Sequence, residues 1–80
     1  MDLKEKVYSF KTKYKEGFTY NEVEELLLDF PNINKEKFDN ALTGITVKLI
    51  DGHIIIYCDD VLNALRCGLE NRDLYSWEWD

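Results

Sequence analysis

Apolar residues recur at helical spacing along the first fifteen positions, and lysines occupy most of the surface between them. This periodicity predicts an amphipathic helix over residues 2–15, which Gly17 would end. The apolar positions of this first helix are Leu3, Val7, Phe10 and Tyr14.

A capping box marks the start of a second helix. Thr19 is followed three residues later by Glu22, so each side chain can bond the backbone N–H of the other residue. Pro31 has no N–H and disfavours helical geometry in the residue before it, so this helix is predicted over residues 19–30. Its apolar stripe consists of Val23, Leu26, Leu27 and Phe30.

Two more helices follow from capping residues and apolar stripes. Asn34 is a favoured N-cap, which predicts a third, short helix over residues 35–43. A later stripe predicts a fourth helix over residues 60–71, with Asp59 or Asp60 as its N-cap.

Between these two helices the apolar period changes to two, which predicts strands over residues 45–58. Asp51 and Gly52 form the favoured pair for a two-residue hairpin turn, because both positions need a positive φ. Counting outward from the turn puts a wholly apolar set on the face expected to be core: Ile45, Val47, Leu49, Ile54, Ile56 and Cys58. The opposite face carries Thr46, Lys48, Ile50, His53, Ile55 and Tyr57.

The predicted fold class is therefore α+β, with residues 1–80 forming a single domain. Four helices pack on one two-stranded antiparallel hairpin, in the order ααα-ββ-α. The inner face of the hairpin is expected to pack on Val23, Leu27, Phe38, Leu62 and Leu65.

This order resembles a winged helix-turn-helix domain over nearly the whole chain. The resemblance implies that the third helix enters the major groove of DNA and that the hairpin contacts phosphate. The positions that would make these contacts are Lys35, Lys37, Asn40, Lys48 and His53.

Charge argues against a nucleic-acid partner. Sixteen Asp and Glu against ten Lys and Arg give a net charge of −6, which repels phosphate at long range. In the third helix Lys35 and Lys37 are offset by Glu36 and Asp39. We expect direct nucleic-acid binding to be disfavoured, and a DNA-binding transcriptional regulator remains the alternative function.

Size and hydropathy exclude other classes. A chain of 80 residues has room for one core but not for the two domains of a cofactor-dependent enzyme. It has no run approaching the roughly 18 apolar residues of a membrane span, and residues 1–6 lack the apolar core of a signal peptide. The expected location is the cytoplasm, with no membrane partner.

Candidate catalytic chemistry is sparse. On the predicted hairpin Cys58 and the single His53 lie on opposite faces, so they cannot form a nucleophile and base pair. With Cys67 they make three scattered ligands, fewer than a zinc site needs. Cys67 is expected to be a buried apolar residue. We therefore expect no catalytic residue, no metal, no cofactor and no enzyme activity.

The small size, acidity and aromatic content resemble those of phage-encoded inhibitors of host nucleic-acid enzymes, a group that includes anti-CRISPR proteins and DNA mimics. This resemblance implies a non-enzymatic, protein-binding inhibitor that blocks the basic nucleic-acid-binding surface of a host enzyme or defence complex. The acids that carry the resemblance are Glu22, Glu24, Glu25, Asp29, Asp59, Asp60, Asp73, Glu78 and Asp80.

The outer face of the hairpin and the C-terminal tail complete the expected binding surface. A hairpin covered on one side leaves Ile50, Ile55 and Tyr57 exposed, to be covered by a third strand, a partner, a second copy in a homodimer or the tail itself. Residues 74–80 form an aromatic and acidic tail that is expected to dock on the domain. The tail contributes Tyr75, Trp77 and Trp79 to the predicted partner-binding set, beside the acids at 22, 24, 25, 29, 73, 78 and 80.

Overall fold

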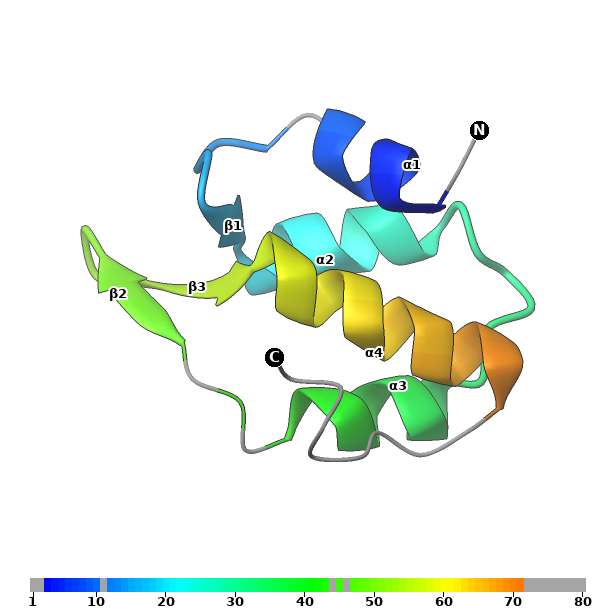
Figure 1. The fold of residues 1–80 in the computed structure, drawn as a ribbon. Helices are drawn as coiled ribbons and strands as arrows, with labels where there is room; N and C mark the ends of the chain where they lie inside the picture. Colours follow the sequence, from blue (N-terminus) through cyan, green and yellow to red (C-terminus); the bar gives the residue numbers. More distant parts are fainter. Residues whose placement is uncertain (1–2, 11, 44, 46, 72–80) are drawn as a thin grey trace.

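The computed structural model describes residues 3–10, 12–43, 45 and 47–71 of the chain. Four helices surround a small three-stranded antiparallel sheet, so the predicted α+β class is confirmed (Figure 1). The elements in chain order are α1 (Leu3–Ser9), β1 (Gly17–Phe18), α2 (Tyr20–Leu27), α3 (Lys35–Leu42), β2 (Lys48–Ile50), β3 (His53–Tyr57) and α4 (Cys58–Glu70). The sheet order is β1-β3-β2, and β3 is its central strand.

The strand β1 was not predicted, and it corrects both the two-stranded hairpin and the extent of the first helix. Helix α1 ends at Ser9 instead of residue 15. The Thr12 hydroxyl donates to the Gly17 carbonyl at 2.8 Å and accepts from the Tyr14 N–H, which makes a local turn in place of helix. Gly17 then continues as strand, paired with Tyr57.

Helix α2 begins as predicted but ends earlier. The Thr19 hydroxyl accepts from the Glu22 N–H, and the Glu22 carboxylate accepts from the Thr19 N–H at 2.9 Å, which completes the capping box. The helix ends at Leu27 rather than at residue 30. The N–H groups of Asp29 and Phe30 donate to the carbonyls three residues earlier, those of Leu26 and Leu27, which is the pattern of a tighter 3₁₀ turn.

Helices α3 and α4 pack along each other, and α4 runs through the middle of the molecule (Figure 1). Asn34 caps α3 as predicted, and its own N–H bonds the Gly68 carbonyl of α4 at 3.1 Å. Helix α4 starts at Cys58, directly after β3, and Tyr57 is its N-cap. The predicted cap at Asp59 or Asp60 is therefore wrong, and both carboxylates lie inside the first turn, where they still favour the helix dipole.

The hairpin register is confirmed at each of its three pairs: Lys48 with Ile55, Leu49 with Ile54, and Ile50 with His53. Asp51 and Gly52 have φ values of 50° and 80°, as the predicted turn requires. After these three pairs, Ile56 pairs with Phe18 of β1. The segment 45–58, which was predicted to be strand, contains β2, β3 and the first residue of α4.

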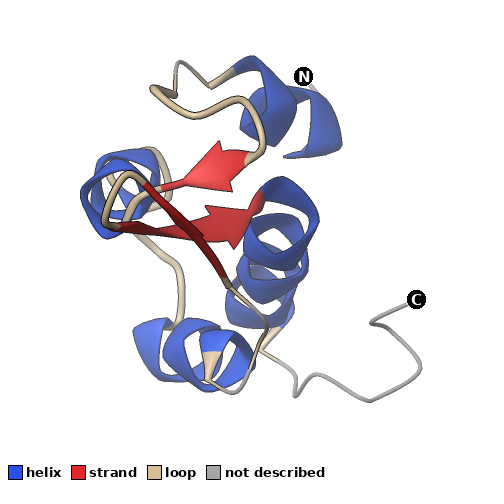
Figure 2. Ribbon diagram, turned by 90° about the vertical axis from the view of Figure 1, so that its left-hand side faces the viewer, coloured by secondary structure: helices blue, strands red, loops and turns tan. Residues whose placement is uncertain are grey.

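The core contains only part of the apolar hairpin face. Ile56 is 1% exposed and belongs to the same buried cluster as Val23, Phe38, Leu62 and Leu65, with Leu27 packed against it. Val47, Leu49 and Ile54 were expected in the core, but they are 41%, 71% and 41% exposed. The reason is that the hairpin extends past the ends of the helices, so no helix covers its outer half (Figures 1 and 2).

The opposite hairpin face is also different from the prediction. Ile55 is fully buried and Tyr57 is half-buried, so the expectation that this face is exposed is wrong. The Tyr14 ring lies 5.9 Å from the ring of His53, which shares a face with Ile55, so the turn before β1 lies beside this face. A third strand, one of the candidates for covering the hairpin, is present as β1, but it pairs with the edge of β3 rather than lying over this face.

Candidate functional site

An exposed apolar strip lies along one face of the hairpin. Leu49 and Ile54 face each other across β2 and β3, and Val47 is two residues before Leu49 on the same face. All three side chains are at least two-fifths exposed. Isolated exposed apolar residues are ordinary, but a continuous set on a protruding element is typical of an interaction surface.

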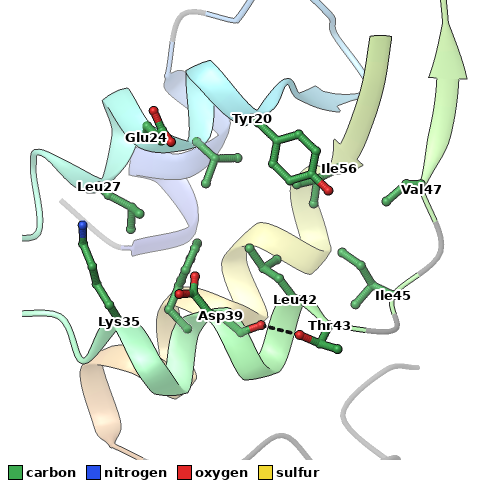
Figure 3. Close-up of a pocket in the computed structure, with 12 residues that line it drawn as sticks. Tyr20, Glu24, Leu27, Lys35, Asp39, Leu42, Thr43, Ile45, Val47 and Ile56 are labelled. Atoms are coloured by element: carbon green, nitrogen blue, oxygen red, sulfur yellow. Dashed lines mark hydrogen bonds between the residues drawn. The ribbon is translucent and has the colours of Figure 1, made fainter. Parts of the chain in front are cut away.

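This apolar strip continues into a groove of about 600 Å³ between α2, α3 and the hairpin (Figure 3). In Figure 3 the side chains of Ile45 and Val47 point toward Leu42 and Ile56, and the Tyr20 ring closes the upper end. Residues from all three elements line the groove: Tyr20, Val23, Glu24, Leu27, Lys35, Phe38, Asp39, Leu42, Thr43, Ile45, Val47 and Ile56. The groove and the apolar strip share Val47 and form one surface.

Local sequence rules place the walls of the groove. The capping box at Thr19 fixes the start of α2, which sends Val23 and Leu27 inward and leaves Glu24 at the rim. The Asn34 cap does the same for α3, where Phe38 is buried and Asp39 is exposed. The Thr43 hydroxyl donates to the Asp39 carbonyl at 2.9 Å and secures the end of that wall.

The charges around the groove are mainly negative. Glu24 on α2 and Asp39 on α3 are carboxylates on opposite walls, and Lys35 is the single cation among the described residues that line the groove. Residues 17–34 contain four acids and no Lys or Arg. The α2 wall therefore attracts cations, while the floor of the groove is apolar.

The structure distributes the predicted partner-binding residues unevenly. Glu24, Glu25 and Asp29 are exposed on or just after α2. Glu22 is taken up by the fold, because its carboxylate accepts from the N–H groups of Thr19 and Lys13. Ile55 is buried and Tyr57 is half-buried, so neither offers the exposed side chain that was predicted. The other predicted residues lie outside the described part of the chain: Asp73, Tyr75, Trp77, Glu78, Trp79 and Asp80.

The residues that a DNA-binding hairpin would use are partly engaged elsewhere. Lys48 pairs with Glu16 at 2.6 Å, and this hydrogen bond raises the pKa of Lys48. On α3 the exposed charges Lys35, Glu36 and Asp39 do not sum to a basic surface. No basic patch is therefore formed by α3 and the hairpin within the described part of the chain.

Reactive side chains do not gather at the groove. Cys67 is buried in the core, as predicted, and Cys58 is half-buried at the start of α4. Burial and the neighbouring Asp59 raise the pKa of the Cys58 thiol, which lowers its thiolate fraction at neutral pH. Among the residues that the structure describes, no cluster of three or more His, Cys, Asp or Glu side chains is arranged to hold a metal ion.

Val47, Leu49 and Ile54 were expected in the core, so neither the exposed strip that they form nor the groove that it extends was predicted. A period of two identifies the apolar face of a hairpin but not how far the helices reach along it. The sequence pattern contains no signal for this, because the reach of the helices along the hairpin is set by tertiary packing.

Comparisons with protein-family models, with curated proteins and with solved structures found no match. Within the described ranges, none of the helices has the length and apolar character needed to cross a membrane.

Proposed function

We propose that this chain is a non-enzymatic protein-binding domain, and that it inhibits a host nucleic-acid-handling protein by covering its basic surface. The observation that carries the proposal is the apolar strip of Val47, Leu49 and Ile54, which protrudes from the fold and continues into the groove. Apolar surface of this kind gains free energy when a partner removes it from water, at about 25 cal/mol per Å².

Leu49 is the expected anchor of the contact. It is 71% exposed at the protruding end of the molecule, so a partner can surround it without moving the helices. The few residues that dominate a protein interface each cost about 2 kcal/mol or more when they are truncated.

Electrostatics supports a basic partner. The exposed acids on or just after α2, Glu24, Glu25 and Asp29, are not accompanied by any cation on that helix. With the net charge of −6 they would speed association with a positively charged surface, and this contribution falls as salt rises. These features support the phage-type inhibitor that the composition resembles.

The second candidate is a winged-helix-like DNA-binding regulator. It is favoured by the order of the elements, because α2 and α3 are followed by the hairpin β2-β3 and then by α4. It is opposed by the Lys48–Glu16 pair and by the balanced charges of α3, which leave few cations for phosphate.

The two candidates are separated by binding experiments with matched variants. Immobilised protein should capture a basic nucleic-acid-handling protein from host lysate and reduce that protein's nucleic-acid binding in a mobility-shift assay. Leu49→Lys should abolish capture, whereas Leu69→Lys, at a 43% exposed position on α4 outside the groove, should not. Sequence-specific binding of the chain itself to duplex DNA at physiological salt would instead establish the regulator.

A further inference from the structure

The shape of the combined surface indicates a macromolecular ligand. A small-molecule site encloses most of its ligand. Here the apolar lining leaves the groove at Val47 and runs out along the hairpin to Leu49 and Ile54, which stay exposed among the residues that the structure describes. A ligand that contacts both parts must therefore be longer than the groove.

An added strand is a poor match for this surface. Strand β2 is the edge of the sheet next to the groove, but it has only three residues. So short an edge offers few backbone hydrogen bonds, and very short edge strands are one of the ways in which proteins prevent strand addition. The groove instead provides apolar side chains on three sides, which is how proteins receive the apolar face of a helix.

The charges then select the kind of helix. Glu24 and Asp39 stand on opposite walls of the groove, and within the described residues neither carboxylate is in an ion pair. An amphipathic helix that buries its apolar stripe between these walls places its flanking side chains beside both carboxylates. Lysine or arginine at the flanks is complementary to them, whereas acidic flanks are repelled.

We propose that the groove between α2, α3 and the hairpin binds a basic amphipathic helix of the partner, with its apolar stripe on Leu42, Ile45 and Val47 and its basic flanks beside Glu24 and Asp39. The proposal rests on the proposed function and specifies the partner element. Lys35, at one end of the groove, opposes a basic ligand, so its replacement by an acid should strengthen binding.

Three synthetic peptides of about 18 residues test the pattern and the charge separately. The first contains Leu and Lys at helical period, the second has the same composition in strict alternation, and the third has Leu and Glu at helical period. Fluorescence anisotropy with the full chain at about 150 mM salt should give the first peptide a Kd of about 1–10 μM. The other two should bind at least about tenfold more weakly.

Surface variants locate the binding. Glu24→Lys and Asp39→Lys should each weaken binding of the helical Leu/Lys peptide by about fivefold, and Lys35→Glu should strengthen it about threefold. Glu25→Lys is the matched control, because it makes the same charge change at an exposed position of α2 that does not line the groove. It should alter the Kd by less than about twofold, and the melting temperatures should show that all variants are folded.

The inference is overturned if the alternating peptide binds as tightly as the helical one, if Glu25→Lys weakens binding as much as Glu24→Lys, or if no peptide binds. None of these results removes the proposed function, which depends on capture of a basic nucleic-acid-handling protein and its loss in Leu49→Lys. If no nucleic-acid-handling protein is captured but the helical Leu/Lys peptide still binds tightly, the proposed inhibitor function is excluded and the groove remains a helix-binding site.

Discussion

The Lys48 ammonium lies 2.6 Å from the Glu16 carboxylate and joins the edge strand of the hairpin to the turn before β1. These residues are 32 positions apart in the sequence, and the contact links the two segments that flank β3. Both side chains are about half exposed, so water and salt compete with the ion pair.

This exposure predicts a small and salt-dependent contribution to stability. Lys48→Gln, Glu16→Gln and the double variant should form a cycle whose coupling is favourable in low salt and vanishes in about 1 M salt. Urea denaturation measures each free energy of unfolding. A coupling that is unchanged by salt would mean that the pair is not a solvated ion pair.

Three consecutive isoleucines have different environments, which allows a matched comparison. Ile55 and Ile56 are 0% and 1% exposed, whereas Ile54 is 41% exposed. Replacement by Ala should lower the free energy of unfolding by about 2–5 kcal/mol at either buried position and by less than about 1 kcal/mol at Ile54. Equal effects at Ile54 and Ile55 in urea denaturation would contradict the orientation of β3.

Gly17 and Gly52 predict two different penalties for the same substitution. A Cβ at Gly17 would lie 2.0 Å from the carbonyl oxygen of Ile56, so the pairing of β1 with β3 would have to open. A Cβ at Gly52 would meet nothing within 4 Å, but the φ of 80° strains any other residue.

We therefore expect Gly52→Ala to cost about 1 kcal/mol and Gly17→Ala to cost more than about 2 kcal/mol. Thermal and urea denaturation would rank the two variants. The reverse ranking would show that β1 is not held against β3.

Glu22 predicts a pH dependence of stability. Burial raises the pKa of Glu22, but hydrogen bonds from the N–H groups of Thr19 and Lys13 lower it. The hydroxyls of Thr12 and Thr19 lower it further, so the pKa is below its ordinary value of 4.5. The folded state therefore favours the carboxylate, and its stabilisation is present above pH 4.5 and is lost as the pH falls through the lowered pKa.

Glu22→Gln should accordingly destabilise the protein at pH 7 but much less at pH 3. Chemical denaturation at both pH values checks this, and Glu25→Gln, at an exposed position outside the capping box, is the control. A penalty for Glu22→Gln that is the same at both pH values would exclude a role for the charge.

The C-terminal tail lies outside the described residues, and its docking stays a prediction. Both Trp residues of the chain, Trp77 and Trp79, are in it, so the intrinsic Trp fluorescence reports on the tail alone. If the tail closes the domain, Trp emission is blue-shifted and deletion of residues 75–80 lowers the melting temperature. Emission of fully hydrated indole together with an unchanged melting temperature would contradict docking.

Local signals in the sequence predicted the elements that depend on local chemistry. The capping box at Thr19, the Asn34 cap and the Asp51-Gly52 turn all appear as expected, because each is satisfied by backbone groups within a few residues. The register of the hairpin follows from its turn for the same reason.

Long-range pairing could not be predicted in the same way. Strand β1 has two residues and therefore no period, and it is stabilised by β3 nearly forty residues later in the chain. That pairing makes β3 the central strand of the sheet, and the reach of the helices decides which hairpin residues remain exposed. Both depend on tertiary geometry. Of the two carboxylates of the groove, Glu24 was among the predicted partner-binding residues and Asp39 was not, while Val47, Leu49 and Ile54 were assigned to the core.

The direct junction of β3 with α4 has a consequence for the entropy of binding. Tyr57 ends the strand and Cys58 begins the helix, with no loop residue between them that could act as a hinge. A change in the orientation of the apolar strip relative to α4 would therefore have to distort the strand or the helix itself. A ligand that binds the strip loses its own conformational freedom, but the domain has less conformational freedom to lose at this junction than it would at a flexible loop. More of the contact free energy is therefore retained as affinity.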